Sequence, residues 1–149
     1  MVGANLKRAI SPWEYNKVKL LRVIDGDTLD FEVDTGFHNK TTQRFRLRGY
    51  NSPEVRGIER PMGLAARQRL IDLFDSTEVE DYQITTYKAD SFGRWLCDVK
   101  LLIRDNEATR NWYDLVTYLR QEGWGVYWAR GRDRYQFNIQ DYPIGQGNA

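Results

Sequence analysis

Residues 18–33, VKLLRVIDGDTLDFEV, show two alternating patterns on either side of an acidic turn. The segment from Thr28 to Val33 alternates strictly between polar and apolar residues, which is typical of a strand with one face in a core. The segment from Val18 to Ile24 is apolar on both faces and indicates a strand partly buried on both sides. Asp25-Gly26-Asp27 between them indicates a turn or bulge. We therefore expect two consecutive strands here.

The rest of the chain predicts three more strands and two helices. Asn51-Ser52-Pro53 ends the third strand, because proline cannot continue a central strand, and residues 34–42 are expected to form a polar loop. The further strands are expected over residues 43–50, 79–87 and 94–103, and the helices over 64–74 and 112–123. Three strands, a helix, two strands and a helix is the order of an OB-fold barrel.

The expected fold class is therefore mainly β with helices (α+β). We predict a five-stranded OB-fold barrel with two helices and a C-terminal tail without a clear third helix. The expected division is an N-terminal arm over residues 1–16, one folded domain over 17–126 and the tail over 127–149. A chain of 149 residues suits one domain with a single core.

Composition excludes several classes of protein. The net charge of +1 does not by itself indicate a nucleic-acid binder, so any such role depends on where the arginines lie. Cys97 is the single cysteine, which excludes an internal disulfide, and its apolar surroundings predict a small buried residue. No apolar stretch is long enough to span a membrane, and no signal peptide is apparent. We expect a monomer that is cytoplasmic, or secreted if a signal was already removed.

Three clusters carry candidate chemistry. Asp25 and Asp27 flank a glycine, and an acidic turn suits a hard cation, although a turn alone explains the pattern equally well. Arg44, Arg46 and Arg48 are spaced by two, so their guanidinium groups share one strand face. That row suits phosphate, or it is a solvated face.

The arginine row continues into further polar groups. Asn51, Ser52 and Glu54 follow it directly, so oxygen ligands and a carboxylate come at the end of the strand. In the third cluster, Asp90 and Arg94 lie in an expected hairpin, where the alternative is an ordinary turn with an edge charge. A cation site, a phosphate clamp and a candidate base within one segment are more than a solvated face requires.

Short motifs in these clusters resemble the signature segments of the staphylococcal nuclease (SNase, or thermonuclease) family. The motifs are VIDGDT at residues 23–28, FRL at 45–47 with SPE at 52–54, and FGR at 92–94. They occur in the family's order and at similar separations, and the resemblance extends from Val18 to Gly125. Three motifs in register are much more specific than any one of them.

The resemblance implies a role for each matching residue. Arg46 and Arg94 match the arginines that hold the scissile phosphate, and Glu54 matches the glutamate that activates or positions the attacking water. The matching metal-site positions are Asp27, Asn51, Asp25 and the backbone carbonyl of Ser52. The expected cofactor is one calcium ion, with Mn²⁺ or Mg²⁺ as alternatives, and the expected substrate is DNA, RNA or both, cut to leave 3′-phosphate ends.

The sequence departs from the family pattern at two places. Asn51 replaces a carboxylate with an amide, which still offers an oxygen but loses a negative charge. The tail lacks the family's final helix and instead mixes basic and aromatic residues, namely Arg130, Arg132, Arg134, Trp128, Tyr135 and Phe137. Such a mixture suits single-stranded nucleic acid, or a tail packed across the barrel. We also expect nucleic-acid contacts from Arg44, Arg48, Phe92 and Tyr127.

Two functions remain open at this point. The first is a calcium-dependent endonuclease that hydrolyses phosphodiester bonds by attack of water, with arginines stabilising the transition state. The second is a catalytically weakened or inactive SNase-like domain that binds nucleic acid. Glu54 favours the first, because a carboxylate beside a phosphate repels it and is of little use to a pure binder.

Overall fold

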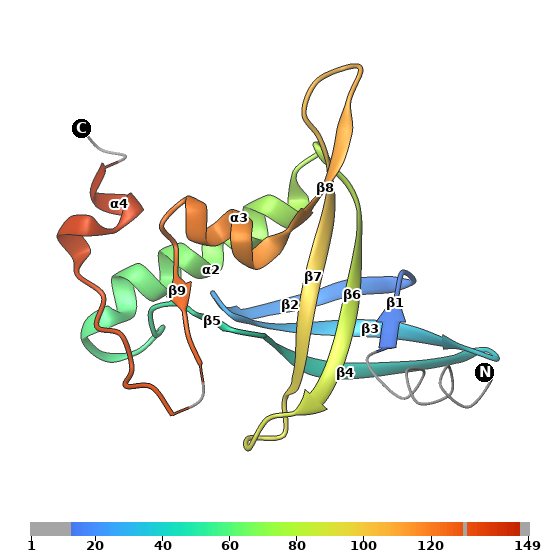
Figure 1. Cartoon of the computed structure of the whole chain (residues 1–149), viewed down its shortest axis with the longest axis horizontal. Helices are drawn as coiled ribbons and strands as arrows, with labels where there is room; N and C mark the ends of the chain where they lie inside the picture. Colours follow the sequence, from blue (N-terminus) through green and yellow to red (C-terminus); the bar gives the residue numbers. More distant parts are fainter. Residues whose placement is uncertain (1–12, 130, 147–149) are drawn as a thin grey trace, which may run out of the picture.

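The structure, a computed structural model, describes residues 13–129 and 131–146 and is mainly β with helices, as predicted (Figure 1). Residues 1–12 of the expected arm, and Arg130, lie outside the described residues. The strands are β1 (Trp13–Tyr15), β2 (Val18–Asp25), β3 (Thr28–Gly36), β4 (Asn39–Leu47), β5 (Tyr50–Asn51), β6 (Val79–Ala89), β7 (Trp95–Arg104), β8 (Arg110–Asp114) and β9 (Val126–Tyr127). The helices are α2 (Arg60–Asp75), α3 (Leu115–Gln121) and α4 (Pro143–Gln146), with 3₁₀ turns η1 (Gly57–Glu59) and η2 (Ile139–Asp141).

The main sheet has the strand order β1-β6-β7-β4-β3-β2, with β8 added beside β7. Strands β4 and β7 pair in parallel, with Phe45 opposite Trp95, and the other pairs are antiparallel. No ladder joins β6 to β2 within the described residues, so the sheet is not closed. The backbone N–H of Leu20 on β2 donates to the hydroxyl of Tyr82 on β6 at 2.7 Å. The five-stranded OB-fold barrel itself stays a prediction.

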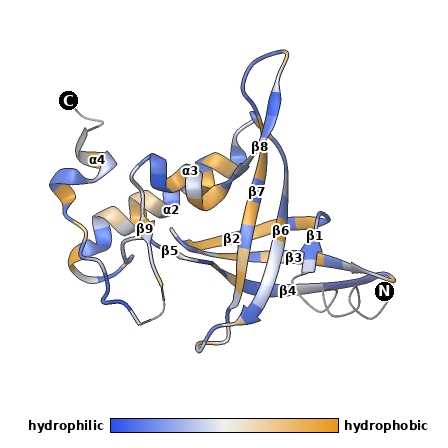
Figure 2. Cartoon of the chain, in the orientation of Figure 1, coloured by the Kyte–Doolittle hydropathy of each residue, from blue (hydrophilic) through white to orange (hydrophobic). Residues whose placement is uncertain are grey.

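The core lies between the sheet and helices α2 and α3, which share one side of it (Figure 1). Apolar residues follow β7 along its middle, whereas the loop from β7 to β8 is hydrophilic (Figure 2). Leu70 of α2 and Leu115 of α3 are fully buried together with Phe31 and Ile84 of the sheet. Cys97 is buried in the same core, as expected, and burial raises the pKa of its thiol.

The predicted loop over residues 34–42 is wrong. Strands β3 and β4 continue through it and leave only Phe37 and His38 as a tight turn, both with positive φ. Two residues with positive φ match the right-handed twist of the flanking strands, so pairing continues to the tip of the hairpin. The polar composition reflects a hairpin end beyond the core, where both faces meet solvent.

The predicted start of the second helix at Trp112 is also wrong. Trp112 lies on strand β8, is 46% exposed and pairs with Leu102 of β7. Helix α3 begins after Asp114, whose carboxylate accepts a hydrogen bond from the backbone N–H of Thr117 at 3.0 Å. This N-cap fixes the start of the helix, and the helical spacing of Trp112 is coincidental.

The tail packs on the first half of α2 and forms no long helix within its described residues, as predicted. Tyr142 is 2% exposed and forms a small second core with Met62 and Ala66. Its hydroxyl donates to the carbonyl of Trp124 at 2.7 Å. The division into arm, domain and tail stays a prediction. None of the described helices has the length and apolar character that crossing a bilayer requires.

Candidate active site

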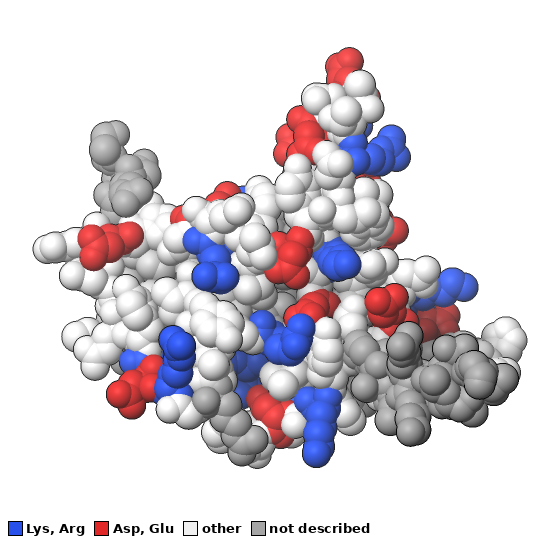
Figure 3. Space-filling model, in the orientation of Figure 1, with Lys and Arg blue, Asp and Glu red and all other residues white. Residues whose placement is uncertain are grey.

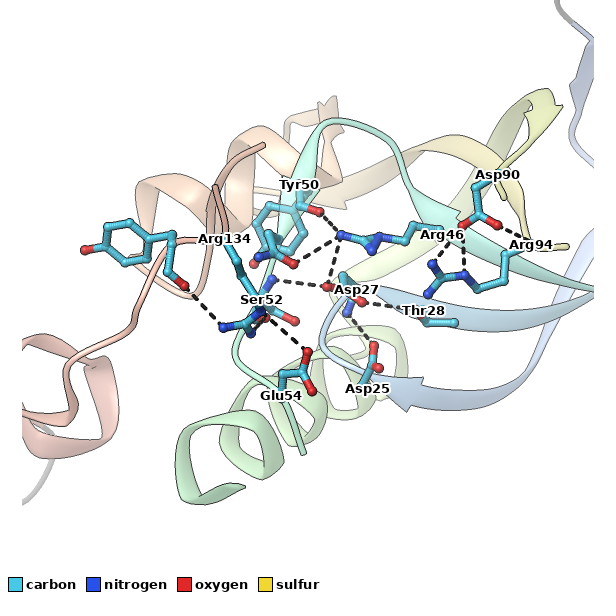
Figure 4. A network of polar contacts seen from close by, with 12 residues as sticks. Asp25, Asp27, Thr28, Arg46, Tyr50, Ser52, Glu54, Asp90, Arg94 and Arg134 are labelled. Carbon is cyan, nitrogen blue, oxygen red and sulfur yellow. Dashed lines mark hydrogen bonds and ion pairs between the residues drawn. The ribbon is translucent and has the colours of Figure 1, made fainter. Parts of the chain in front are cut away.

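The site begins at Asp27, a buried carboxylate in the turn from β2 to β3. Its Oδ2 accepts a hydrogen bond from the backbone N–H of Ser52 at 3.2 Å, and its Oδ1 accepts one from the Thr28 hydroxyl at 3.0 Å (Figure 4). Its own carbonyl accepts a hydrogen bond from the backbone N–H of Leu47 at 2.9 Å. One residue thereby joins the acidic turn, the end of β4 and the segment after β5.

Gly26 allows this turn to approach its neighbours closely. A Cβ atom at this position would lie 2.6 Å from the Ser52 hydroxyl and 2.7 Å from the Ala66 side chain on α2. No side chain fits in that space, so glycine is required by packing at this point of the signature motif.

Arg46 extends from β4 toward the same point. Its Nη2 donates to the carbonyl oxygen of Tyr50 at 2.8 Å and to Oδ1 of Asn51 at 3.2 Å, and it lies 3.6 Å from Oδ2 of Asp27. Three oxygens thus surround one cationic nitrogen. Tyr50 is fully buried, which fixes the backbone that carries these oxygens.

Asp25 lies beside Asp27 and is oriented by it. Its Oδ1 accepts a hydrogen bond from the backbone N–H of Asp27 at 3.1 Å. Burial, together with the nearby Asp27 carboxylate, raises the pKa of Asp25 to about 7. Near neutral pH, Asp25 is therefore only partly ionised.

The oxygens of this site have the chemistry that a hard divalent cation requires. Asp27 offers a buried carboxylate and Asn51 an amide oxygen, both next to the same nitrogen of Arg46, while the Ser52 carbonyl lies at the site's edge. Within residues 13–129 and 131–146, no three His, Cys, Asp or Glu side chains come together. The oxygen set of Asp27 and Asn51 thus has the chemistry of hard-cation ligands but carries few full negative charges.

Glu54 lies on the loop from β5 to α2, and its backbone is held on two sides. Its N–H donates to Oε1 of Glu59 at 3.0 Å. Its carbonyl packs against Gly63 of α2, where a Cβ atom would fall inside contact distance of the carbonyl oxygen. The Glu54 side chain itself is 61% exposed.

Arg94 comes from the hairpin between β6 and β7. Its guanidinium pairs with Asp90 through Nε and Nη2, each at 2.8 Å from Oδ2. The same carboxylate accepts hydrogen bonds from the backbone N–H groups of Phe92 and Arg94, so the turn and its arginine are fixed together. Phe92 is 81% exposed, with Arg94 5.2 Å from its ring centre.

A cavity of about 950 Å³ is lined by Arg46, Asn51, Glu54 and Arg94 and has room for a ligand of nucleotide size, whereas Asp25, Asp27 and Ser52 are not among its lining residues. Five of its side chains are arginines. The polar and aromatic lining consists of Arg46, Asn51, Glu54, Arg56, Asp90, Ser91, Phe92, Arg94, Trp128, Arg132 and Arg134. Residues from the end of β4, from β5 and the segment after it, from the hairpin between β6 and β7, and from the tail thus line the same cavity.

Comparison with known proteins agrees with this arrangement. An 88-residue stretch is 35% identical to a curated protein named micrococcal nuclease from Shigella flexneri. This similarity is in line with the resemblance of the sequence motifs to the SNase family. The match covers 59% of this chain but only 44% of that relative's length, and no family model matches the chain.

Three residues for which the sequence predicts nucleic-acid contact are not among the residues that line the cavity. Arg44 pairs with Asp30, and Arg48 pairs with Asp98, each with a contact of 2.8 Å. Tyr127 lies between Arg120 and Arg132, about 5.8 Å from each. Phe92, by contrast, lines the cavity. Contact of these residues with nucleic acid stays a prediction.

The sequence does not predict Glu59 and Arg134 among the site residues. Glu59, at the end of η1, belongs to no motif that marks it as buried. Arg134 stands out in the sequence only as part of a basic and aromatic tail. Its interleaving with aromatic residues was the one available signal, because only the fold places the tail beside Glu54.

The surface charge of the protein is mixed. Acidic and basic side chains are interspersed over the face shown in Figure 3, in keeping with the net charge of +1. Attraction of an anion therefore depends on the local arginines of the cavity and not on a broad positive field.

Gly63→Ala tests the packing of the Glu54 loop on α2. In an open helix this change is stabilising, by about 0.5–1 kcal/mol. Here the new methyl group would meet the Glu54 carbonyl, so we expect the free energy of unfolding to fall by about 1–3 kcal/mol. Urea unfolding measures it, with Leu64→Ala, at the next and partly exposed position, as the control expected to change by less than about 1 kcal/mol. A more stable Gly63→Ala protein would contradict the close packing.

Proposed function

We propose that this chain is a divalent-cation-dependent nuclease that hydrolyses phosphodiester bonds of DNA or RNA. The observation that carries the proposal is that Arg46, Glu54 and Arg94 line one cavity next to the oxygens of Asp27 and Asn51. The similarity to a protein named micrococcal nuclease supports the same reaction class. The proposed substrate is a polyanion bound by a monomer.

In the proposed reaction, a water oxygen forms a bond to phosphorus while the bond to the leaving ester oxygen breaks. Glu54 accepts the proton of the attacking water, because its exposed carboxylate faces the cavity. Arg46 and Arg94 donate hydrogen bonds to the non-bridging oxygens, where negative charge builds up in the transition state. Neither arginine has to move far, because Tyr50 and Asp90 already hold them.

Calcium is the proposed cation, with Mn²⁺ or Mg²⁺ as alternatives. Asp27, Asn51, the Ser52 carbonyl and Asp25 would hold it. Once bound, the cation would supply Lewis-acid stabilisation of the phosphate oxygens. The partly protonated Asp25 would ionise more readily beside a divalent charge.

Glu54→Gln tests the assignment of the base. The amide keeps the size of the side chain but cannot accept the proton, so we expect cleavage of plasmid DNA in calcium to fall by about 10²–10⁴-fold. Circular dichroism should show an unchanged fold, and chelation should stop the native enzyme. The matched control is Glu107→Gln, on the exposed loop between β7 and β8. Cleavage at the native rate by Glu54→Gln would remove this residue from the mechanism.

The arginines of the row and Arg94 should divide into two classes. Arg46→Ala and Arg94→Ala should each lower kcat by about 10²-fold or more, since each removes a donor to the developing charge. Lysine should not restore the rate fully, because an ammonium group cannot form the bidentate fork. Arg44→Ala and Arg48→Ala remove half-exposed ion pairs, and Arg48→Ala also a contact with the Tyr87 ring, so they should change kcat by less than about threefold. Equal losses in all four variants would instead indicate a diffuse basic face.

The second candidate function is a nucleic-acid-binding domain without cleavage. The observation that favours it is Asn51, because its amide oxygen already accepts a hydrogen bond from Arg46 and adds no negative charge. An arginine cation then satisfies part of the oxygen set that a metal would use.

Asn51→Asp distinguishes the two candidates. A second full carboxylate beside Asp27 should strengthen calcium binding, so the calcium concentration for half-maximal cleavage should fall by about tenfold. Titration of native and variant proteins with calcium, at fixed pH and substrate, measures this. An unchanged calcium dependence would show that residue 51 is not a ligand. Cleavage by neither protein in calcium, manganese or magnesium would favour the binding domain.

A further inference from the structure

Arg134, from the tail, is joined to Glu59 in a close ion pair. Its Nη2 donates to Oε1 of Glu59 at 2.7 Å, and its Nη1 donates to Oε2 at 2.9 Å. The Glu59 side chain is only 9% exposed. Hydrogen bonds from Arg134 hold the pKa of Glu59 below its usual value. A buried carboxylate needs such a partner, so removal of Arg134 would leave the Glu59 charge with only backbone hydrogen bonds, from Glu54 and Phe137.

Glu59 transmits this constraint to Glu54. The carboxylate oxygen that receives Nη2 of Arg134 also accepts the backbone N–H of Glu54 at 3.0 Å. The loop from β5 to α2 is therefore fixed at the Glu54 amide by Glu59 and at the Glu54 carbonyl by packing on Gly63. Arg134 holds the Glu59 carboxylate in place and, through it, the Glu54 amide.

Arg134 also contacts the Glu54 side chain directly. Its Nε lies 3.5 Å from Oε1 of Glu54, and its Nη2 lies 3.5 Å from the carbonyl oxygen of Ser52 (Figure 4). In the described part of the chain, no other side chain forms a hydrogen bond or ion pair with the Glu54 carboxylate. An exposed glutamate otherwise samples several rotamers, so this contact favours the rotamer in which the carboxylate lies next to Arg134.

We propose that Arg134 is a positioning residue for the candidate base Glu54, acting through Glu59 and through the contact with the Glu54 carboxylate. This inference rests on the proposed nuclease function. By this inference, the tail holds the Glu54 carboxylate, the proposed water-activating group, toward the cavity. Misplacement of a reacting group by about 1 Å costs on the order of 10²-fold in rate.

The first experiment compares Arg134→Met with Arg110→Met. Both changes remove an arginine from an ion pair, but Arg110 pairs with Glu80 at 3.2 Å on the exposed β8 strand, away from the cavity. We expect Arg134→Met to lower kcat by about 10–100-fold with KM changed by less than about threefold. Arg110→Met should stay within about twofold of the native kcat. Arg134→Lys should recover part of the loss, because lysine keeps the charge without the fork.

A second comparison separates positioning from general loss of structure. In a Glu54→Gln background, Arg134→Met should lower the remaining single-turnover rate by less than about twofold, because the group that it positions is already gone. Amide hydrogen exchange at Glu54 should become about tenfold faster in Arg134→Met, since the acceptor Glu59 is released. If Arg134→Met does not fold, Arg134→Lys replaces it in both measurements, with smaller changes of the same sign.

The outcomes distinguish the inference from the proposed function. A native protein that cuts no nucleic acid overturns the nuclease proposal itself. If the native protein is active, the positioning role alone is overturned by an unchanged kcat in Arg134→Met. It is also overturned if Arg134→Met lowers the rate by the same factor in the native and the Glu54→Gln backgrounds. Unchanged exchange at the Glu54 amide also overturns it.

Discussion

The Asp27 carboxylate is the interaction on which the candidate site depends. It is nearly inaccessible to water, and it accepts hydrogen bonds from Thr28 and from the backbone of Ser52, with the Arg46 guanidinium beside it. A charge in that position is stable only while these partners remain, so the acidic turn, strand β4 and the segment after β5 are held at fixed positions. Gly26 makes the required approach possible by leaving no side chain in the contact.

Local patterns were sufficient for the parts of the fold that have strong periodicity. The alternation from Thr28 to Val33 correctly predicted β3, and the apolar spacing around Leu70 correctly predicted α2. The predictions are wrong where a turn conformation or a helix cap outweighs the composition of the segment. Phe37 and His38 form a two-residue turn within a polar stretch, and the Asp114 cap starts α3 later than the apolar spacing implies.

The candidate site divides in the same way. Asp27, Arg46 and Glu54 lie in short motifs, so the sequence alone predicts that they lie near one another. Glu59 and Arg134 carry no motif, and their ion pair connects two segments far apart in the chain. Only tertiary structure determines such a pair, because its strength comes from the burial of Glu59 in the fold and not from the residues next to Glu59 in the sequence.

The parallel pairing of β4 with β7 has a consequence for the order in which the protein is made. Phe45 is paired with Trp95, so Arg46 and Arg94 cannot face one cavity until β7 has left the ribosome. Arg134 follows later still, and loop closure over such separations makes folding slower than in a helical protein of this size. A partly synthesised chain therefore contains Asp27, Arg46 and Glu54 before the cavity of the candidate site has formed. The topology delays assembly of the candidate site until most of the chain has been made.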